Sequence, residues 1–297
     1  MIPKGGTELL IKNLQKYIQP KQLETVNLIA SICNFSALSD TKTNIIWQHL
    51  SYDQDNVKGM LDKQFVNQID QFVYVSKWQF DKFREYFNTP NDRSIIIRNA
   101  IEPIAYIPRT ESKKLKLIYT STPWRGLEVL LDAIDILKRD DIELDVYSST
   151  VIYGKNFMPN AFDNLFNRCR ATKNVIYRGY ALNKAIRNAV QQAHIFSYPS
   201  VFEETSCLSA IEAGAAGCRI VTTDYGALPE TCDVYANYVA YNSDRKKLAQ
   251  DYAEVLNYEI DAYWDNQESL MQQSEYFNNK YSWDNRKLEW EDLFNSL

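Results

Sequence analysis

The chain has 297 residues, 45% of them hydrophobic and 24% charged, a composition typical of an ordinary globular protein with two domains. A net charge of -5 argues against nucleic acid as a partner, because phosphate binding needs a concentrated Lys/Arg face. No apolar run is long enough to span a bilayer, and the first residues lack a signal-peptide pattern. We therefore expect a cytoplasmic protein, and a peripheral contact with a membrane surface stays open.

The five cysteines are scattered and lack paired spacing, which favours reduced thiols over a disulfide framework or a zinc site. His49 and His194 are the only histidines, so a His-rich metal centre is excluded. We expect no metal and no cofactor.

The first third of the chain alternates between helical and strand-like segments. The predicted helices cover residues 7–18 and 77–87, and the predicted strands cover residues 25–33, 44–47, 72–76 and 94–98. Such alternation predicts a parallel, doubly wound α/β sheet.

Residues 103–114 contain two prolines and many polar side chains, which is typical of a linker. The alternation then restarts with strands at 115–120, 144–147, 174–177, 195–198 and 219–222 and an amphipathic helix at 126–137. We therefore expect two Rossmann-like domains, residues 1–108 and 109–275.

Ligands of open parallel sheets bind beyond the carboxyl ends of the strands, so the turns that follow strands are the candidate sites. After the strand that ends at Tyr198, Thr205 and Ser206 are good N-caps, and a helix is predicted to begin there. The free N–H groups of Ser206, Cys207 and Leu208 would then face the crevice and favour a phosphate.

Glu204 and Glu212 are eight residues apart, which is up to about 12 Å along a helix. That exceeds the separation of roughly 5 to 9.5 Å between the carboxylates of a glycosidase. The spacing suits the two ends of one long ligand, with sugar hydroxyls at Glu204, a diphosphate at the helix start and ribose hydroxyls at Glu212. The alternative is a solvated turn at Glu204 and an exposed helix position at Glu212.

Residues 199–230 resemble the Glu-x7-Glu motif of the family 4 retaining glycosyltransferases, including the Gly-x-x-x-Glu turn from Gly226 to Glu230. The resemblance implies the GT-B fold, in which two Rossmann-like domains with parallel sheets face a central cleft. It also implies that Glu204 contacts the transferred sugar and Glu212 the ribose.

Arg125 precedes Gly126 in the turn after the strand at 115–120, where a guanidinium can clamp phosphate oxygens. It resembles the family's basic residue before this glycine, whereas Ser121 and Thr122 stand where a second basic residue is usual. Thr122 is a candidate donor-binding residue. A surface position at the start of the helix is the alternative for Arg125.

Gly5 and Gly6 resemble the family's glycine-rich loop, which faces the donor phosphate, although a flexible terminus is an alternative. The first strand of the family fold is nearly missing before them, so we expect a shortened first domain, which is either a reduced acceptor domain or the result of a reading frame that starts late. His49 matches a histidine near the transferred sugar, with a packed histidine as its alternative, and His194 is expected in the core.

Tyr180 follows a strand and turn that resemble the segment whose backbone holds the nucleotide base. Residues 281–283, in a predicted final helix, resemble the terminal segment that packs back onto the first domain, and we assign residues 276–297 to it.

The resemblance implies metal-independent transfer of a sugar from a UDP- or GDP-linked donor to a glycan, lipid or other acceptor hydroxyl. Retention would follow from front-face attack, with the leaving phosphate taking the acceptor's proton. Arg125 and the helix start would stabilise the leaving diphosphate. A sugar-nucleotide epimerase or hydrolase of the same fold, or a degenerate nucleotide- or glycan-binding module, remain alternatives. The sequence leaves the base, the sugar, the acceptor and the oligomeric state open.

Overall fold

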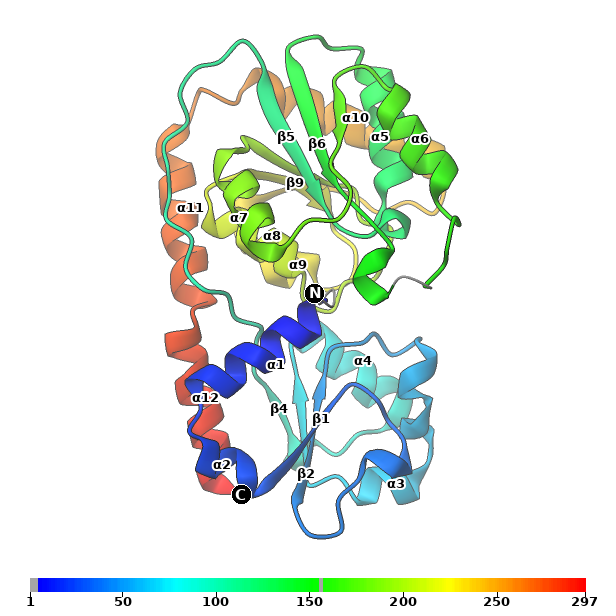
Figure 1. The fold of residues 1–297 in the computed structure, drawn as a ribbon, viewed down its shortest axis with the longest axis vertical. Coiled ribbons are helices and arrows are strands. Elements are labelled where there is room, and N and C mark those ends of the chain that lie inside the picture. The colour runs from blue at the N-terminus through cyan, green and yellow to red at the C-terminus, as the bar shows by residue number, and fades with distance from the viewer. Residues whose placement is uncertain (1–4, 155–156) are drawn as a thin grey trace.

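The computed structural model describes residues 5–154 and 157–297. Its helices and strands form two α/β units joined by a segment without regular structure, as Figure 1 shows. The predicted class, two parallel sheets in a GT-B arrangement, is confirmed.

The first unit holds a four-stranded parallel sheet in the order β1-β2-β3-β4. The strands are β1 (Val26–Ala30), β2 (Thr43–Gln48), β3 (Gln71–Tyr74) and β4 (Ser94–Ile96). The helices are α1 (Gly6–Tyr17), α2 (Pro20–Glu24), α3 (Lys63–Asn67) and α4 (Lys77–Phe87).

The second unit holds a six-stranded parallel sheet in the order β10-β9-β8-β5-β6-β7. The strands are β5 (Leu115–Thr120), β6 (Ile142–Tyr147), β7 (Val175–Tyr177), β8 (Ile195–Tyr198), β9 (Arg219–Thr223) and β10 (Ala236–Val239). The helices are α5 (Leu127–Leu137), α6 (Asp163–Ala171), α7 (Asn183–Gln192), α8 (Leu208–Ala215), α9 (Leu228–Cys232) and α10 (Arg245–Asp261).

The strand order reverses between β5 and β8, because β5 pairs with β6 on one side and with β8 on the other. The loops that leave the carboxyl ends of strands on either side of such a reversal diverge and open a crevice for ligands. The β5 loop carries Arg125 and the β8 loop carries Glu204.

Two C-terminal helices connect the units, α11 (Gln267–Lys280) and α12 (Trp283–Ser296). Figure 1 shows them running along one side of the molecule past both sheets. Trp283, Trp290 and Leu293 of α12 pack into the same apolar cluster as Leu10 and Leu14 of α1. The end of the chain is therefore part of the core of the first unit.

The prediction of a single final helix through residues 281–283 is wrong. Residue 281 follows the end of α11, and Ser282 caps α12 by accepting a hydrogen bond from the N–H of Asn285 at 3.3 Å. The serine hydroxyl competes with the helix backbone, so it starts a new helix where sequence periodicity suggests continuation.

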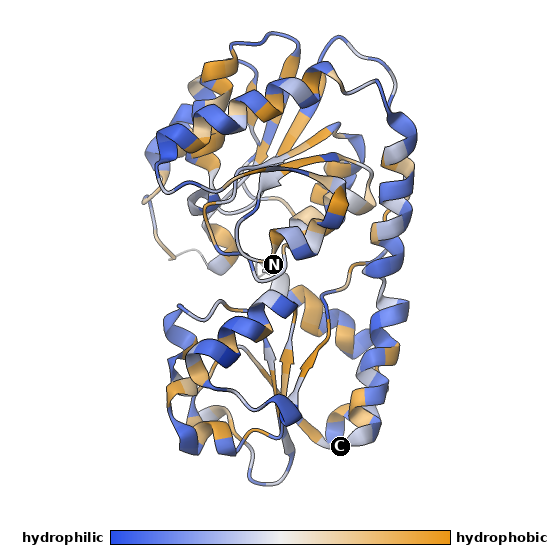
Figure 2. Ribbon diagram, turned by 180° about the vertical axis from the view of Figure 1, so that it is seen from behind, coloured by the Kyte–Doolittle hydropathy of each residue, from blue (hydrophilic) through white to orange (hydrophobic). Residues whose placement is uncertain are grey.

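Apolar residues of both sheets are covered by helices whose outer faces are polar, as the hydropathy colouring in Figure 2 shows. All five cysteines are buried and unpaired, as expected. Among the described helices, none combines the length and the apolar character that crossing a bilayer requires.

Candidate active site

Arg125 ends a short 3-10 turn, Pro123–Arg125, between β5 and α5. The next residue, Gly126, has a φ of 128°, and a Cβ there would lie 2.0 Å from the carbonyl oxygen of Pro199. Val201 donates its N–H to the carbonyl of Arg125 at 3.2 Å. Only glycine fits at position 126, and the close approach of Gly126 to Pro199 holds the β5 loop against the β8 loop.

Arg125 and Glu204 form an ion pair across these two loops, in which one guanidinium nitrogen contacts both carboxylate oxygens. Nη1 of Arg125 lies 2.8 Å and 3.1 Å from the two carboxylate oxygens, and the Tyr198 hydroxyl donates to Oε1 at 2.5 Å. Glu204 is 3% exposed, so the alternative of a solvated turn is excluded for it. Burial alone would lower the pKa of Arg125, but the Glu204 carboxylate raises it overall, so the guanidinium stays charged.

The guanidinium of Arg125 keeps capacity for a further acceptor. Its Nε is buried and has no partner among the described residues. The group also stacks on the ring of Phe202, with 4.3 Å between the guanidinium carbon and the ring centroid. Such a stacked, preorganised guanidinium can bind a phosphate oxygen while it holds a carboxylate.

The backbone of Glu204 is fixed against the turn after β9. Glu204 forms a parallel bridge with Gly226, and Ala227 donates its N–H to the carbonyl of Glu204 at 2.7 Å. Gly226 has a φ of 65°, and a Cβ there would lie 2.6 Å from the Glu204 nitrogen. The Gly-x-x-x-Glu turn therefore supports the candidate catalytic carboxylate.

Helix α8 begins at Leu208, so the prediction of a start capped by Thr205 or Ser206 is wrong. Thr205 instead donates its hydroxyl to the carbonyl of His49 at 2.9 Å, and the carbonyl of Ser206 accepts from Asn99 at 3.3 Å. Contacts with the first unit thus replace the local cap. Cys207 occupies the N-cap position without a side-chain hydrogen bond, which leaves the positive helix end uncapped by a side chain.

The start of α1 meets the start of α8. A Cβ on Gly6 would lie 2.9 Å from Cδ1 of Leu208, and a Cβ on Gly5 would lie 4.0 Å from the ring of Tyr153. Gly6 therefore lies against the first residue of α8, the helix end that the sequence assigns to phosphate, whereas the nearest atom to a Cβ on Gly5 would be Oε2 of Glu8 at 2.9 Å. Residues 1–4 lie outside the described part of the chain.

His49 lies at the carboxyl end of β2, in the loop that contacts Thr205. Its ring packs 4.5 Å from that of Trp47, and its Nε2 is buried with no partner among the described residues. Burial lowers the pKa of His49 to about 3, so the imidazole is neutral at pH 7.

His194 lies in the core, as expected. It is 4% exposed and accepts a hydrogen bond at Nδ1 from the N–H of Lys116 at 3.0 Å.

Glu212 lies one to two turns along α8 and is held by α7. Its Oε1 accepts from Asn183 at 3.2 Å and from Arg187 at 3.1 Å. Its side chain is 13% exposed, which excludes an exposed helix position, and burial raises its pKa. Tyr180 stands three residues before Asn183, in the loop from β7 to α7, and is 39% exposed.

Thr122 is buried at the carboxyl end of β5. Its carbonyl accepts from the Tyr119 hydroxyl at 2.7 Å, and its own hydroxyl has no partner among the described residues. It therefore shapes the turn before Arg125 and carries a buried hydroxyl there.

The site contains residues that the sequence patterns did not single out. Tyr198, Asn183 and Arg187 bind the two glutamates. Only Tyr198 carried a usable signal, since it is the last residue of a strand next to a candidate turn. Arg187 carries no such signal, and only the folded structure shows its contacts with Glu212 and with the carbonyl of Glu102, the latter at 2.7 Å.

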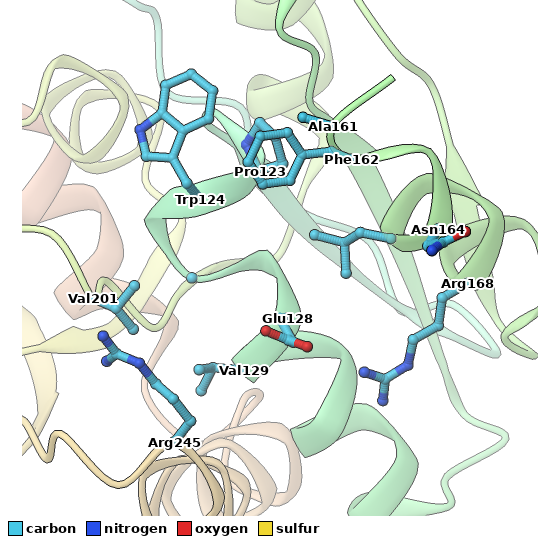
Figure 3. Close-up of a pocket in the computed structure, with 12 residues that line it drawn as sticks. Pro123, Trp124, Glu128, Val129, Ala161, Phe162, Asn164, Arg168, Val201 and Arg245 are labelled. Atoms are coloured by element: carbon cyan, nitrogen blue, oxygen red, sulfur yellow. The ribbon is translucent and has the colours of Figure 1, made fainter. Parts of the chain in front are cut away.

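A separate cavity of about 460 Å³ lies beneath the turn that holds Arg125. Figure 3 shows Pro123, Trp124 and Phe162 on one side, Arg168 and Arg245 on two others, and Glu128 between the arginines. None of the predicted site residues lines it. Across residues 5–154 and 157–297, no group of three or more His, Cys, Asp or Glu could hold a metal ion.

This fold and crevice define a protein with the architecture of the GT-B glycosyltransferases. Residues 115–258 match a family described as "Glycosyl transferases group 1". An uncharacterized glycosyltransferase of Methanocaldococcus jannaschii is 25% identical over 234 residues, which cover 72% of this chain and 57% of that protein. The chain is similar to both, and it spans little more than half of the relative's length.

Solved structures resemble nearly the whole chain. HepE of Anabaena, in complex with UDP-glucose, superposes with a TM-score of 0.70 at 13% identity over 98% of this chain and 82% of that one. The pneumococcal O-GlcNAc transferase GtfA, in complex with UDP and GlcNAc, superposes with a TM-score of 0.66 at 16% identity over 98% of this chain and 60% of that one. At these identities the likeness establishes the fold.

Proposed function

We propose that the protein transfers a sugar from a nucleoside-diphosphate sugar, UDP- or GDP-linked, to an acceptor hydroxyl. The observation that carries this proposal is the pairing of Arg125 with Glu204 at the strand-order reversal, where contacts to the first unit also hold the start of α8. A cation, a carboxylate and a positive helix end are the groups that a sugar diphosphate requires. The nucleotides bound to HepE and GtfA support this choice of donor class.

In this proposal the donor lies along the carboxyl ends of β5 and β8 and the start of α8. Its diphosphate would bind Arg125 and the N–H groups at Ser206, Cys207 and Leu208, with Thr122 and the Gly5–Gly6 backbone beside it. Glu204 would accept hydroxyl hydrogens of the sugar. Glu212 would bind the ribose, and the loop of Tyr180 would hold the base.

The reaction breaks the bond between the anomeric carbon and the diphosphate oxygen and forms a bond to the acceptor oxygen. We propose that attack occurs on the face that the diphosphate leaves, so the configuration is retained and a phosphate oxygen takes the acceptor's proton. Arg125 neutralises the departing charge. His49, being neutral, can hydrogen-bond the sugar but adds no positive charge.

The acceptor would approach from the first unit, and contact between the units would exclude water that otherwise hydrolyses the donor. No metal ion or cofactor is needed for these steps, because Arg125 and the helix end supply the charge stabilisation. We place this activity in the cytoplasm, where nucleotide sugars would be available as donors.

Thermal unfolding with a panel of nucleoside diphosphates tests the donor assignment, because a ligand of the native state raises apparent stability. UDP or GDP should raise the melting temperature of the wild type. Glu212→Ala should reduce that shift, Glu204→Gln should retain it while transfer is lost, and Glu254→Ala on exposed α10 is the control. Absence of a shift with every nucleotide contradicts the proposal.

Product analysis tests the mechanism. NMR of the product should show the anomeric configuration of the donor, and inversion would exclude front-face attack. Donor turnover with no acceptor present would instead indicate an epimerase or hydrolase.

A further inference from the structure

Two stacked pairs of tyrosines, one from each unit, lie beside the candidate active site. The rings of Tyr52 and Tyr86 are 4.2 Å apart at 23°, and those of Tyr225 and Tyr241 are 3.7 Å apart at 2°. We call these four residues the tyrosine rim.

One tyrosine of each pair stands close along the chain to a residue of the candidate active site. Tyr52 stands three residues after His49, beyond the carboxyl end of β2. Tyr225 directly precedes Gly226, whose backbone bridges to Glu204. One residue of each pair is therefore close along the chain to a candidate catalytic residue or to its backbone partner.

Glu203 lies in a segment that contacts both neighbourhoods. The next residue, Glu204, bridges to Gly226 beside Tyr225, and Thr205 donates its hydroxyl to the carbonyl of His49, three residues before Tyr52. Burial raises the pKa of Tyr52, and the stacked Tyr86 and the Glu203 carboxylate raise it further. Burial, the same carboxylate and Tyr241 raise the pKa of Tyr225 to about 12, with a contribution from Asp53 of the first unit. These shifts agree with a position of Glu203 near both pairs.

The rings of the rim are held in place. Asp224 accepts the N–H of Tyr241 at 2.7 Å, which fixes the second pair to the turn after β9. The ammonium group of Lys82 lies 5.4 Å from the centroid of Tyr52 and 5.7 Å from that of Tyr86. A preorganised aromatic surface loses little conformational entropy when it binds a ligand.

The rim is also accessible. Tyr86 is 52% exposed, and the other three tyrosines are half-buried. Lys82 lies over the first pair and Arg245 lies 5.6 Å from the centroid of Tyr241, so the exposed remainder of each ring is what a ligand can contact. Aromatic side chains with one apolar body and one polar tip suit ligands that combine both characters.

We propose that the tyrosine rim binds the acceptor and that the acceptor is a saccharide, an inference that rests on the proposed glycosyltransfer. A sugar ring presents an apolar face of C–H groups, which packs on tyrosine, and hydroxyls at its edge. Glu203 and Asp53 accept hydrogen bonds from such hydroxyls. An acyl or polyprenyl chain offers no hydroxyl to these carboxylates, whereas a saccharide does.

Binding to a printed oligosaccharide array, with UDP or GDP present, tests this assignment. Tyr86→Leu and Tyr241→Leu lie outside the proposed donor site and should each lower the array signal at least about tenfold, because each removes an aromatic face but keeps an apolar side chain. Tyr86→Phe and Tyr241→Phe keep the stacking and should restore most of the signal. Tyr258→Leu, on α10 and 68% exposed, is the matched control.

Two results overturn the assignment. One is an equal array signal from the wild type and the leucine variants. The other is a wild type that binds no glycan on the array but transfers sugar to a lipid acceptor. Nucleotide-induced thermal shifts on the same samples separate this failure from failure of the proposed function, since the rim variants should keep the wild-type shift.

Discussion

Arg125 and Glu204 depend on each other, because Glu204 is almost fully buried and Arg125 is its only cationic partner among the described residues. Removing one member of a buried ion pair costs about 3 to 5 kcal/mol, since the other charge stays buried and unpaired. Arg125→Ala should therefore lower the free energy of unfolding by about that amount and abolish the nucleotide-induced thermal shift. Denaturant unfolding measures the first effect.

The double variant Arg125→Ala, Glu204→Gln separates the roles of the pair. It should regain most of the lost stability, since no buried charge remains, but it should not regain nucleotide binding. Recovery of nucleotide binding would contradict the assignment of Arg125 to the diphosphate.

His49 should make stability depend on pH. Its folded pKa of about 3 is below the ordinary value of 6.5, because burial favours the neutral ring. The stability that the neutral ring allows is therefore complete above pH 6.5, and it declines as the pH falls toward 3. Between pH 7 and 5, His49→Gln should lose roughly 2 kcal/mol less stability than the wild type. His194, whose pKa burial lowers to about 4, continues to titrate in the variant. Identical pH dependence of urea unfolding in both proteins would show that His49 is not buried.

Single residues of the site differ in how far the sequence could identify them. Arg125 and Glu204 stand in the loops that follow strands. Ligands of parallel sheets bind at the carboxyl ends of the strands, so the sequence identifies both residues as candidates. Arg187 and Asn183 lie on a helix with no such rule, and only the packing of α7 against α8 brings them to Glu212.

At the level of elements, local signals predicted α4 to the residue. Ser76 caps α4 by accepting from the N–H of Gln79 at 3.1 Å, and Asn88 ends it in a left-handed conformation. The start of α8 was mispredicted because the Thr205 hydroxyl binds His49 in the other unit. A contact between distant segments overrode a good local N-cap, and a sequence pattern does not report such a contact.

The meeting of α1 with α8 should matter for donor binding. Gly6→Val places a branched side chain against Leu208, where even a Cβ would lie 2.9 Å from Cδ1. Displacement of the helix start should weaken UDP or GDP binding about tenfold or more, as measured by calorimetry. Thr7→Val is the control on the same helix, and equal affinity in both variants would remove Gly5 and Gly6 from the donor site.

At the scale of the whole molecule, Glu230 of α9 joins the two units. It accepts from the N–H groups of Lys77 and Trp78 at 2.9 and 3.0 Å, at the start of α4, and from Arg98 at 2.9 Å. A carboxylate from the second unit thus binds the positive end of a helix in the first.

Loss of this contact should loosen the molecule. Glu230→Ala should lower the free energy of unfolding by about 1 to 2 kcal/mol, the usual effect of losing a helix cap, and should increase the radius of gyration without nucleotide. Small-angle scattering measures the second effect, with Glu254→Ala as control. An unchanged radius would show that the other contacts between the units fix their arrangement without Glu230.

A crystal structure with bound UDP or GDP tests the central claim most directly. We expect the diphosphate between Arg125 and the first N–H groups of α8, the ribose at Glu212 and the base beside the loop of Tyr180. A nucleotide bound in the cavity beneath Trp124, or at any place away from Arg125 and α8, would contradict the account.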